Sequence, residues 1–203
     1  MKIILATQNR GKIRELQELL ADENIEVLSL LDISNWEDVE ENGETFADNA
    51  ALKARAAVQK TGLIALADDS GLVVDALNGA PGVYSARYAG EPKDDERNND
   101  KLLHQLESIP DDKRTARFRC ALVIATPDGK EYLTEGTVEG LILRQRRGLD
   151  GFGYDPLFFV QDFARTMAEL NVAQKNKLSH RAQAFRKAIP ILQALKESQT
   201  LDT

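Results

Sequence analysis

Two adjacent carboxylates, Asp68 and Asp69, come directly after a short apolar run and are followed by Ser70 and Gly71. Neighbouring carboxylates repel each other and raise each other's pKa unless a cation neutralises them. Mg²⁺ binds such oxygen ligands and keeps several of its waters for chemistry. The segment therefore predicts a metal-binding turn at the end of a strand. The alternative is a solvated Asp-Asp turn.

Two further glutamates, Glu40 and Glu41, lie in an acidic segment over residues 32–52 that contains no lysine or arginine. Either glutamate could supply a third oxygen ligand if the fold brings it near Asp69. Runs of like charge are more often a solvated face of the molecule. Both interpretations stay open from the residues alone.

The segment from residue 7 to residue 12 lies between a predicted strand and a predicted helix. It reads Thr7, Gln8, Asn9, Arg10, Gly11 and Lys12. Backbone N–H groups at a helix N-terminus, together with a lysine, suit an anion and above all a phosphate. It is not a Walker A loop, because Ala6 stands where the first glycine belongs and Ile13 where Ser or Thr belongs. A phosphate loop and an ordinary helix start are the two interpretations.

A glycine-rich loop over residues 151–156 combines two aromatic side chains with one carboxylate. It reads Gly151, Phe152, Gly153, Tyr154, Asp155 and Pro156. A nucleobase needs an aromatic face for stacking and polar groups at its edge, and glycines let the backbone approach closely. The loop is thus a candidate base site, although its aromatics could instead join the core. For Phe158 and Phe159, just beyond it, we expect the core.

The stretch over residues 171–195 has no acidic residue. Within it, Ser179, His180 and Arg181 stand where a C-terminal helix is expected to begin. Ser179 suits an N-cap, and Pro190 would kink the helix. The His-Arg pair could bind an anion or a carbonyl of a base. The alternative is a solvent-exposed pair without a role in binding.

The composition narrows the function classes. The chain has 203 residues with 26 Lys and Arg against 33 Asp and Glu, a net charge of −7, which repels long nucleic acids. The single cysteine, Cys120, excludes an intrachain disulfide and fits a reducing compartment. The apolar runs are too short for a signal peptide or a membrane span. We expect a soluble cytoplasmic protein without a membrane or a long nucleic acid as partner.

The pattern of apolar residues and turn signals predicts strands and helices in alternation, followed by a hairpin. The expected strands cover residues 3–6, 25–28, 63–67, 116–124, 131–143 and 157–160. The expected helices begin near Ile13, Thr45, Asp94 and Ser179, and the one from Asp94 is expected to end at Ile109. Thr45 with Asp48, and Thr166 with Glu169, resemble capping boxes. A mixed sheet flanked by helices is the simplest architecture for this order. Its strand order does not follow from the pattern.

Six segments in a fixed order together carry a resemblance to a known family. They are Thr7-x-Asn9-x-x-Lys12, Glu41-x-Gly43-x-Thr45-Phe46-x-x-Asn49-Ala50-x-x-Lys53-Ala54, Ala67-Asp68-Asp69-Ser70-Gly71-Leu72, Gly79-Ala80-Pro81-Gly82-Val83-Tyr84-Ser85-Ala86-Arg87-Tyr88, Gly151-Phe152-Gly153-Tyr154-Asp155-Pro156 and Ser179-His180-Arg181. This combination resembles the non-canonical purine nucleoside triphosphate pyrophosphatases, also called inosine or xanthosine triphosphate pyrophosphatases. The resemblance covers nearly the whole chain.

The resemblance implies an α/β protein of mixed α+β type with a long central mixed β-sheet flanked by helices. It implies one domain over residues 1–203, in two lobes with an active-site cleft between them, and a homodimer. Members of the family use Mg²⁺ to hydrolyse ITP, dITP and XTP to the monophosphate and pyrophosphate. This house-cleaning reaction keeps deaminated purines out of the nucleotide pool.

The resemblance also assigns residue roles. Asp69 matches the catalytic carboxylate, and one of Glu40 and Glu41 matches its partner in binding the metal. The positions that match substrate contacts are Thr7, Gln8, Asn9, Arg10, Gly11, Lys12, Ser70, Phe152, Gly153, Tyr154, Asp155, Lys175, His180 and Arg181. The doubled glutamate leaves the metal ligand ambiguous, and Gln8 occupies a variable position often filled by glycine.

The chemistry of these residues agrees with that activity. A triphosphate needs a cation and lysines such as Lys12 and Lys175 to be held by an acidic protein. A 6-oxopurine offers a carbonyl acceptor and an N–H donor, the reverse of adenine. Arg181 or His180 can donate to the carbonyl, and Asp155 can accept from the N–H.

Three other functions are compatible with parts of the sequence. A related pyrophosphatase of pyrimidine or other modified triphosphates would share the opening loop, but not the loop 151–156 together with Ser179-His180-Arg181. A non-catalytic nucleotide sensor would not need both Asp68 and Asp69. A protein-interaction module would need none of these loops. The residues do not rank ITP, dITP and XTP as substrates.

Overall fold

The computed structural model describes residues 1–201 and contains one seven-stranded sheet. Its order is β2-β1-β3-β4-β5-β6-β7. The strands are β1 (Lys2–Leu5), β2 (Glu26–Ser29), β3 (Ile64–Val74), β4 (Thr115–Ala125), β5 (Glu131–Ile142), β6 (Phe158–Val160) and β7 (Arg165–Thr166). β1 pairs in parallel with β2 and β3, whereas β6 pairs antiparallel with β5 and β7. The expected mixed sheet is confirmed.

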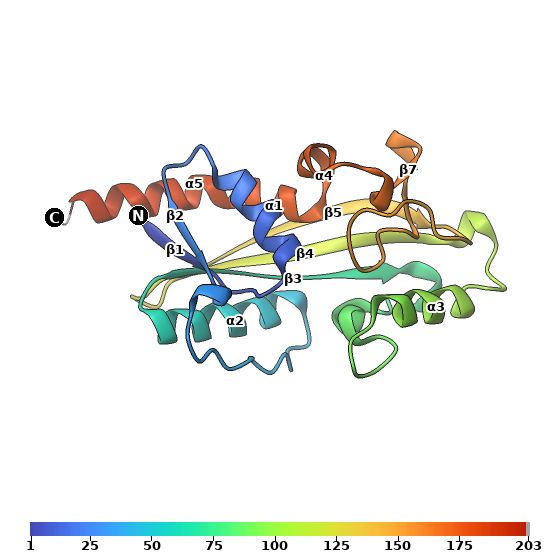
Figure 1. Ribbon diagram of the computed structural model, residues 1–203, viewed down its shortest axis with the longest axis horizontal. Coiled ribbons are helices and arrows are strands. Elements are labelled where there is room, and N and C mark those ends of the chain that lie inside the picture. Colours follow the sequence, from blue (N-terminus) through green and yellow to red (C-terminus); the bar gives the residue numbers. More distant parts are fainter. Residues whose placement is uncertain (202–203) are drawn as a thin grey trace. The chain divides into compact units, whose positions relative to one another are not determined.

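Five α-helices connect and cover these strands in the described part of the chain (Figure 1). They are α1 (Arg10–Leu20), α2 (Phe46–Thr61), α3 (Asp95–Gln105), α4 (Val172–Leu178) and α5 (His180–Leu201). The chain divides into two compact units. Unit 1 comprises residues 1–69, 120–136 and the chain from 180 onwards, and unit 2 comprises residues 70–119 and 137–179.

β1 and the part of β3 in unit 1 bury both of their faces. Ile3, Leu5 and Leu66 belong to one apolar cluster with Leu16 of α1 and Phe185 of α5. Ile4, Ala65 and Ala67 belong to another with alanines of α2, namely Ala50, Ala54 and Ala57. Figure 1 shows α1 and α5 on one side of these strands and α2 on the other. Because successive side chains of a strand point to opposite faces, neighbouring residues of β1 and β3 enter different clusters.

Unit 2 has a core of its own, made by β3, β4, β5, α3 and the segment after residue 150. Leu102 and Leu106 are fully buried there, and Phe118 packs against Phe158 with ring centroids 4.4 Å apart. Tyr154 is also a member of this core, with 4% of its surface exposed.

Most local signals of the sequence are confirmed. The Thr45 capping box opens α2, and the Thr166 capping box opens a short 3-10 helix over Met167–Glu169. The hairpin of β4 and β5 is present. Phe158 is fully buried, as expected, whereas Phe159 is only half-buried and the Arg147 guanidinium lies over its ring. Pro190 lies inside α5, which begins directly after Ser179.

Two local expectations were wrong. The third predicted strand, expected to end at Ala67, continues to Val74, so Asp68-Asp69-Ser70-Gly71 is strand and not turn. The helix expected over residues 94–109 ends at Gln105. Beyond it the chain forms turns, and the carbonyl of Leu106 accepts a hydrogen bond from the Arg114 guanidinium instead of continuing the helix. Pro110 follows, and a proline disfavours the helical conformation at the residue before it.

No helix among residues 1–201 combines the length and the apolar character needed to cross a bilayer.

Candidate active site

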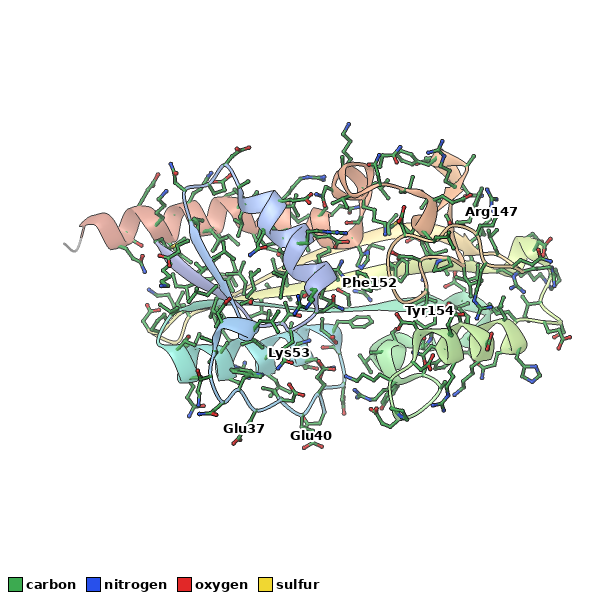
Figure 2. The ribbon with its side chains drawn as sticks, viewed as in Figure 1. Glu37, Glu40, Lys53, Arg147, Phe152 and Tyr154 are labelled. Atoms are coloured by element: carbon green, nitrogen blue, oxygen red, sulfur yellow. The ribbon has the colours of Figure 1, made fainter. Side chains whose placement is uncertain are left out.

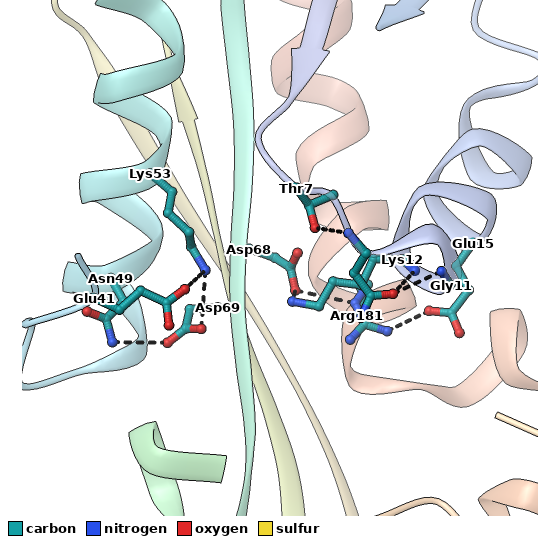
Figure 3. Close-up of polar contacts among 11 residues, drawn as sticks. Thr7, Gly11, Lys12, Glu15, Glu41, Asn49, Lys53, Asp68, Asp69 and Arg181 are labelled. Atoms are coloured by element: carbon teal, nitrogen blue, oxygen red, sulfur yellow. Dashed lines mark hydrogen bonds and ion pairs between the residues drawn. The ribbon is translucent and has the colours of Figure 1, made fainter. Parts of the chain in front are cut away.

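Asp68 and Asp69 point to opposite faces of the sheet. Both lie in β3, where the side-chain period is two, so adjacent residues cannot share one turn or one metal site. Asp68 meets α1 and α5, whereas Asp69 meets α2 (Figure 3). The predicted metal-binding turn of both aspartates is therefore wrong. The strand splits them into two different polar clusters of unit 1.

The Asp68 cluster consists of Lys12, Glu15, Asp68 and Arg181. Lys12 donates from Nζ to Asp68 Oδ2 at 2.7 Å, and Arg181 donates from Nε to the same oxygen at 3.3 Å. Arg181 also donates from Nη1 to Glu15 Oε2 at 2.5 Å. The side chain of Asp68 is 1% exposed and that of Arg181 is 5% exposed. Two carboxylates and two cations thus balance each other in a buried place.

The charge balance fixes Asp68 as an anion. Burial by itself would raise the pKa of this carboxyl, but Lys12, Arg181 and Lys53 outweigh burial and hold its pKa well below the usual range. The pKa of Arg181 is raised, since the attraction of Asp68 and Glu15 exceeds the effect of its own burial. Both shifts favour the charged form of the group.

The Asp69 cluster consists of Glu41, Asn49, Lys53 and Asp69, on the α2 side of β3 (Figure 3). Lys53 Nζ lies 3.3 Å from Asp69 Oδ1 and 3.0 Å from Glu41 Oε1. Asn49 donates from Nδ2 to Asp69 Oδ2 at 3.3 Å, and its Oδ1 accepts from Gly43 N at 2.8 Å. One lysine therefore stands between two carboxylates.

The pKa values in this cluster move upward. Burial raises the pKa of Asp69, and the nearby charges of Glu41 and Asp68 add to it, so that Lys53 and Lys12 do not bring it back to the usual range. Burial lowers the pKa of Lys53, but Asp69, Asp68 and Glu41 together reverse this and raise it. Asp69 is thus the aspartate of the pair that accepts a proton more readily.

The Asp69 cluster has the donor chemistry of a magnesium site. Glu41 and Asp69 offer carboxylate oxygens, and Lys53 already occupies the place of a positive charge between them. No group of three His, Cys, Asp or Glu side chains within residues 1–201 is arranged as a metal cage. Mg²⁺ does not need one, because it commonly binds through one or two carboxylates together with substrate phosphates and water. The residues present fit this ion.

Glu40 does not join the cluster. It is exposed, whereas Glu41 is half-buried against Lys53. Figure 2 shows Glu40 and Glu37 pointing outward, away from the sheet. Of the two glutamates, the geometry therefore places Glu41 beside Asp69.

The segment before α1 forms a structured cap. Asn9 is the N-cap, and its Oδ1 accepts from the N–H groups of Gly11 and Lys12 at 2.9 and 3.1 Å. Thr7 Oγ1 in turn accepts from Asn9 N at 3.2 Å. The backbone N–H groups of Gly11 and Lys12, which we expected to bind an anion, therefore donate to Asn9 within the loop. The lysine of this segment contacts Asp68, while Gln8 contacts Asp38 and Arg10 is exposed.

The loop 151–156 lies in unit 2 and is held at several points. Tyr154 donates from its hydroxyl to Ser85 O at 2.8 Å, and its ring belongs to the apolar core of unit 2. Asp155 pairs with Lys175 at 2.7 Å, and Phe152 N donates to the same carboxylate at 3.3 Å. Phe152 itself is half-buried. A side chain at Gly151 would collide with Asp155 and Lys175, which explains the glycine.

Ser70 and His180 complete the predicted positions. Ser70 follows Asp69 in β3 and is half-buried in unit 2. His180 opens α5 and is 7% exposed in unit 1.

The sequence analysis gave no role to three residues of these clusters: Glu15, Asn49 and Lys53. Asn49 and Lys53 belong to a quoted motif and stand four residues apart on α2, a spacing that places them on one face of the helix. That spacing could have identified both as site residues. Glu15 carries no such signal, because its partner Arg181 is 166 residues away.

Comparisons with known proteins identify the family of this chain. The model of the Ham1 family matches residues 3–191. A dITP/XTP pyrophosphatase of Desulforamulus reducens is 57% identical over 96% of this chain and 97% of its own length. One of Bacillus cereus is 55% identical over 92% of both.

Solved structures give the same result. A HAM1 protein from Coxiella burnetii superposes with a TM-score of 0.86 at 45% identity, covering 95% of this chain and 98% of that one. The Ham1 protein of Staphylococcus aureus gives 0.83 at 42% identity, covering 98% and 100%. Family model, sequence identity and fold therefore lead to one conclusion: this chain belongs to the Ham1 family.

Proposed function

We propose that this chain hydrolyses deaminated purine nucleoside triphosphates, namely dITP, ITP and XTP, to the monophosphate and pyrophosphate with Mg²⁺. The chain is a nucleoside triphosphate pyrophosphatase, since relatives more than 50% identical over nine-tenths of it are named dITP/XTP pyrophosphatases. The observation that carries the finer proposal is the Asp69 cluster. It joins a carboxyl of raised pKa to a second carboxylate and a lysine.

Asp69 and Glu41 would hold the magnesium ion. When bound, the ion neutralises charge on the phosphate oxygens and on the leaving pyrophosphate. The two positive charges of the ion suit the Asp69 cluster better than the Asp68 cluster. The Asp69 cluster has two acids and only one lysine, whereas the two acids of the Asp68 cluster are already balanced by two cations.

Asp69 would act as the general base. Water attacks the α-phosphorus, its oxygen forms a bond there, the bond from phosphorus to the bridging oxygen breaks, and pyrophosphate leaves. The proton of the water passes to Asp69, and burial of this carboxyl makes it a better acceptor than an exposed aspartate. Lys53 and Asn49 orient the two carboxylate oxygens from the α2 side.

The loop 7–12 of unit 1 would bind phosphate oxygens through Lys12, whose ammonium Asp68 holds in place. Asp68 then has a supporting function: it stays ionised and fixes the lysine. We assign Lys175, by contrast, to the base loop of unit 2, because it pairs with Asp155 of that loop.

Base selection in unit 2 would rest on Asp155, which can accept from the N1–H of a 6-oxopurine. In unit 1, Arg181 or His180 can donate to a 6-carbonyl. Adenine would leave such buried groups unpaired, at about 1 to 3 kcal/mol for each. Phe152 offers a ring for stacking, which serves every purine alike. We also propose that the chain forms a homodimer in the cytoplasm.

The test is pyrophosphate release from a panel of triphosphates, each with Mg²⁺ and with excess chelator. We expect turnover of dITP, ITP and XTP, little of dATP and dGTP, and none without the ion. Preference for dUTP or dTTP would identify a pyrimidine enzyme. Binding of dITP without release of pyrophosphate would identify a sensor. Either outcome contradicts the proposal.

A further inference from the structure

Two adjacent asparagines of α3, Asn98 and Asn99, are buried in unit 2, with 2% and 0% of their surface exposed. A buried amide is unfavourable unless it is hydrogen-bonded, so each must have a partner that justifies its position. Asn98 accepts from Ala89 N at 2.7 Å and donates to Ala86 O at 3.1 Å. It fixes the segment before α3.

Asn99 is directed at the loop 151–156 instead. It donates from Nδ2 to Gly153 O at 3.0 Å. Its Oδ1 is buried and has no hydrogen-bond partner among the residues that the structure describes. The contact with Gly153 is therefore the interaction that uses this amide.

A second side chain of α3 holds the other polar group of the same glycine. Asp95 stands four residues before Asn99, one turn earlier on the same face of the helix. Its Oδ2 accepts from Gly153 N at 2.7 Å. One face of α3 thus binds both the N–H and the carbonyl of Gly153.

The two hydrogen bonds from α3 restrain a flexible backbone position at Gly153. Its φ is +60°, in the left-handed region that favours glycine. Glycine has the most backbone freedom of any residue, so the conformation must be fixed from outside. Phe152 precedes it and Asp155 follows two residues later. Any rotation at Gly153 changes the direction of both side chains.

We propose that Asp95 and Asn99 are positioning residues for base recognition. They fix the backbone of Gly153 and thereby set the directions of Phe152 and Asp155. The inference rests on the proposed function, since it takes this loop as the base site. Neither residue takes part in proton transfer or in metal binding.

The experiment compares Asn99→Ala with Asn98→Ala, a matched control on the same helix. We measure kcat and KM for dITP and dATP, the Mg²⁺ requirement and the midpoint of urea unfolding. Both variants remove a buried hydrogen-bonded amide, so both should lose stability. Only Asn99→Ala should raise KM for dITP and reduce the preference for dITP over dATP, each by about threefold to tenfold, the equivalent of one hydrogen bond. Its kcat and its Mg²⁺ requirement should stay near those of the wild type.

Asp95 gives a test that does not depend on the core, because its side chain is exposed. Asp95→Ala removes the acceptor for Gly153 N and should raise KM for dITP in the same way. Asp95→Asn keeps an acceptor oxygen and should restore most of the affinity. This series decides the matter even if both asparagine variants fail to fold.

The outcomes separate this inference from the proposed function. If the wild-type chain does not prefer dITP over dATP, the proposed function fails before any variant is compared. If the wild type does, and Asp95→Ala and Asn99→Ala keep its KM and its preference, the inference is overturned. A fall in kcat with unchanged KM would also overturn it, because the loop would then serve the chemical step.

Discussion

The two faces of β3 in unit 1 carry the same kinds of side chain in different proportions. On the side of α1 and α5, Asp68 and Glu15 meet Lys12 and Arg181. On the side of α2, the acids Asp69 and Glu41 share Lys53, and the remaining partner is the neutral Asn49. The first cluster is balanced, whereas the second has one positive charge fewer.

This difference explains why adjacent aspartates have opposite pKa shifts. The pKa of Asp68 is lowered because cations outweigh the effect of its burial, and the pKa of Asp69 is raised because burial and neighbouring acids outweigh Lys53. Environments that separate the pKa values of two carboxyls divide their functions. In the proposed function, Asp68 therefore fixes Lys12, and Asp69 takes up the proton and binds the metal ion.

The largest expected effect is on activity, at Asp69. Asp69→Asn is nearly isosteric but cannot take a proton, so we expect kcat for dITP to fall by about 10²- to 10⁴-fold. The urea midpoint should not fall. The control is Asp128→Asn, an exposed carboxylate of the β4–β5 turn, which should keep wild-type turnover. Wild-type kcat in a folded Asp69→Asn protein would remove Asp69 from the mechanism.

The same substitution one residue earlier should act on stability. Asp68→Asn removes one partner of a buried ion network and leaves Lys12 and Arg181 short of a charge. We expect about 3 to 5 kcal/mol less free energy of unfolding in urea. Glu131→Gln breaks the exposed pair with Arg55 in the same unit and should cost less than about 1 kcal/mol. Equal losses would show that the Asp68 cluster is not balanced as described.

A smaller effect should separate the two glutamates of the acidic segment. Glu41→Gln removes the negative charge of the proposed ligand beside Asp69 and leaves only a neutral amide oxygen, so the Mg²⁺ concentration for half-maximal activity should rise by about tenfold or more. Glu40→Gln should leave this concentration unchanged, since the side chain points outward. The measurement is a magnesium titration of dITP hydrolysis at saturating substrate. A rise in the Glu40 variant alone would move the ligand to the other glutamate.

The smallest effects are on the pH dependence of stability, and they should have opposite signs. Asp68 has a lowered pKa, so its contribution is present above the unfolded value of about 3.9 and is lost as the pH falls through the folded pKa. Asp68→Asn should therefore lose less stability in acid than the wild type.

Asp69 has a raised pKa, so its favourable contribution is present below the unfolded value and is lost as the pH rises through the folded pKa. Asp69→Asn should thus be at least as stable as the wild type at pH 7. Urea unfolding in chelator at pH 3 and pH 7 measures both variants. Shifts of the same sign would contradict the comparison.

The sequence predicted much of the local structure because the signals for it are local. The Thr45 capping box, the hairpin of β4 and β5 and the helix that contains Ile13 all depend on residues within a few positions. The same kind of reasoning failed at Asp68-Asp69-Ser70-Gly71. Its composition is typical of a turn, but helices on both faces supply partners that keep it in the sheet.

The chemistry of the site divides in the same way. The residue types and the alternation of a strand follow from the sequence alone, since any extended chain directs neighbours to opposite faces. Which charge each aspartate meets was decided by the tertiary structure. Asp69 finds Lys53 only 16 residues away, but Asp68 depends on Lys12 at a separation of 56 and on Arg181 at 113. Contacts at such separations arise from packing of whole helices against the sheet, and no local pattern encodes them.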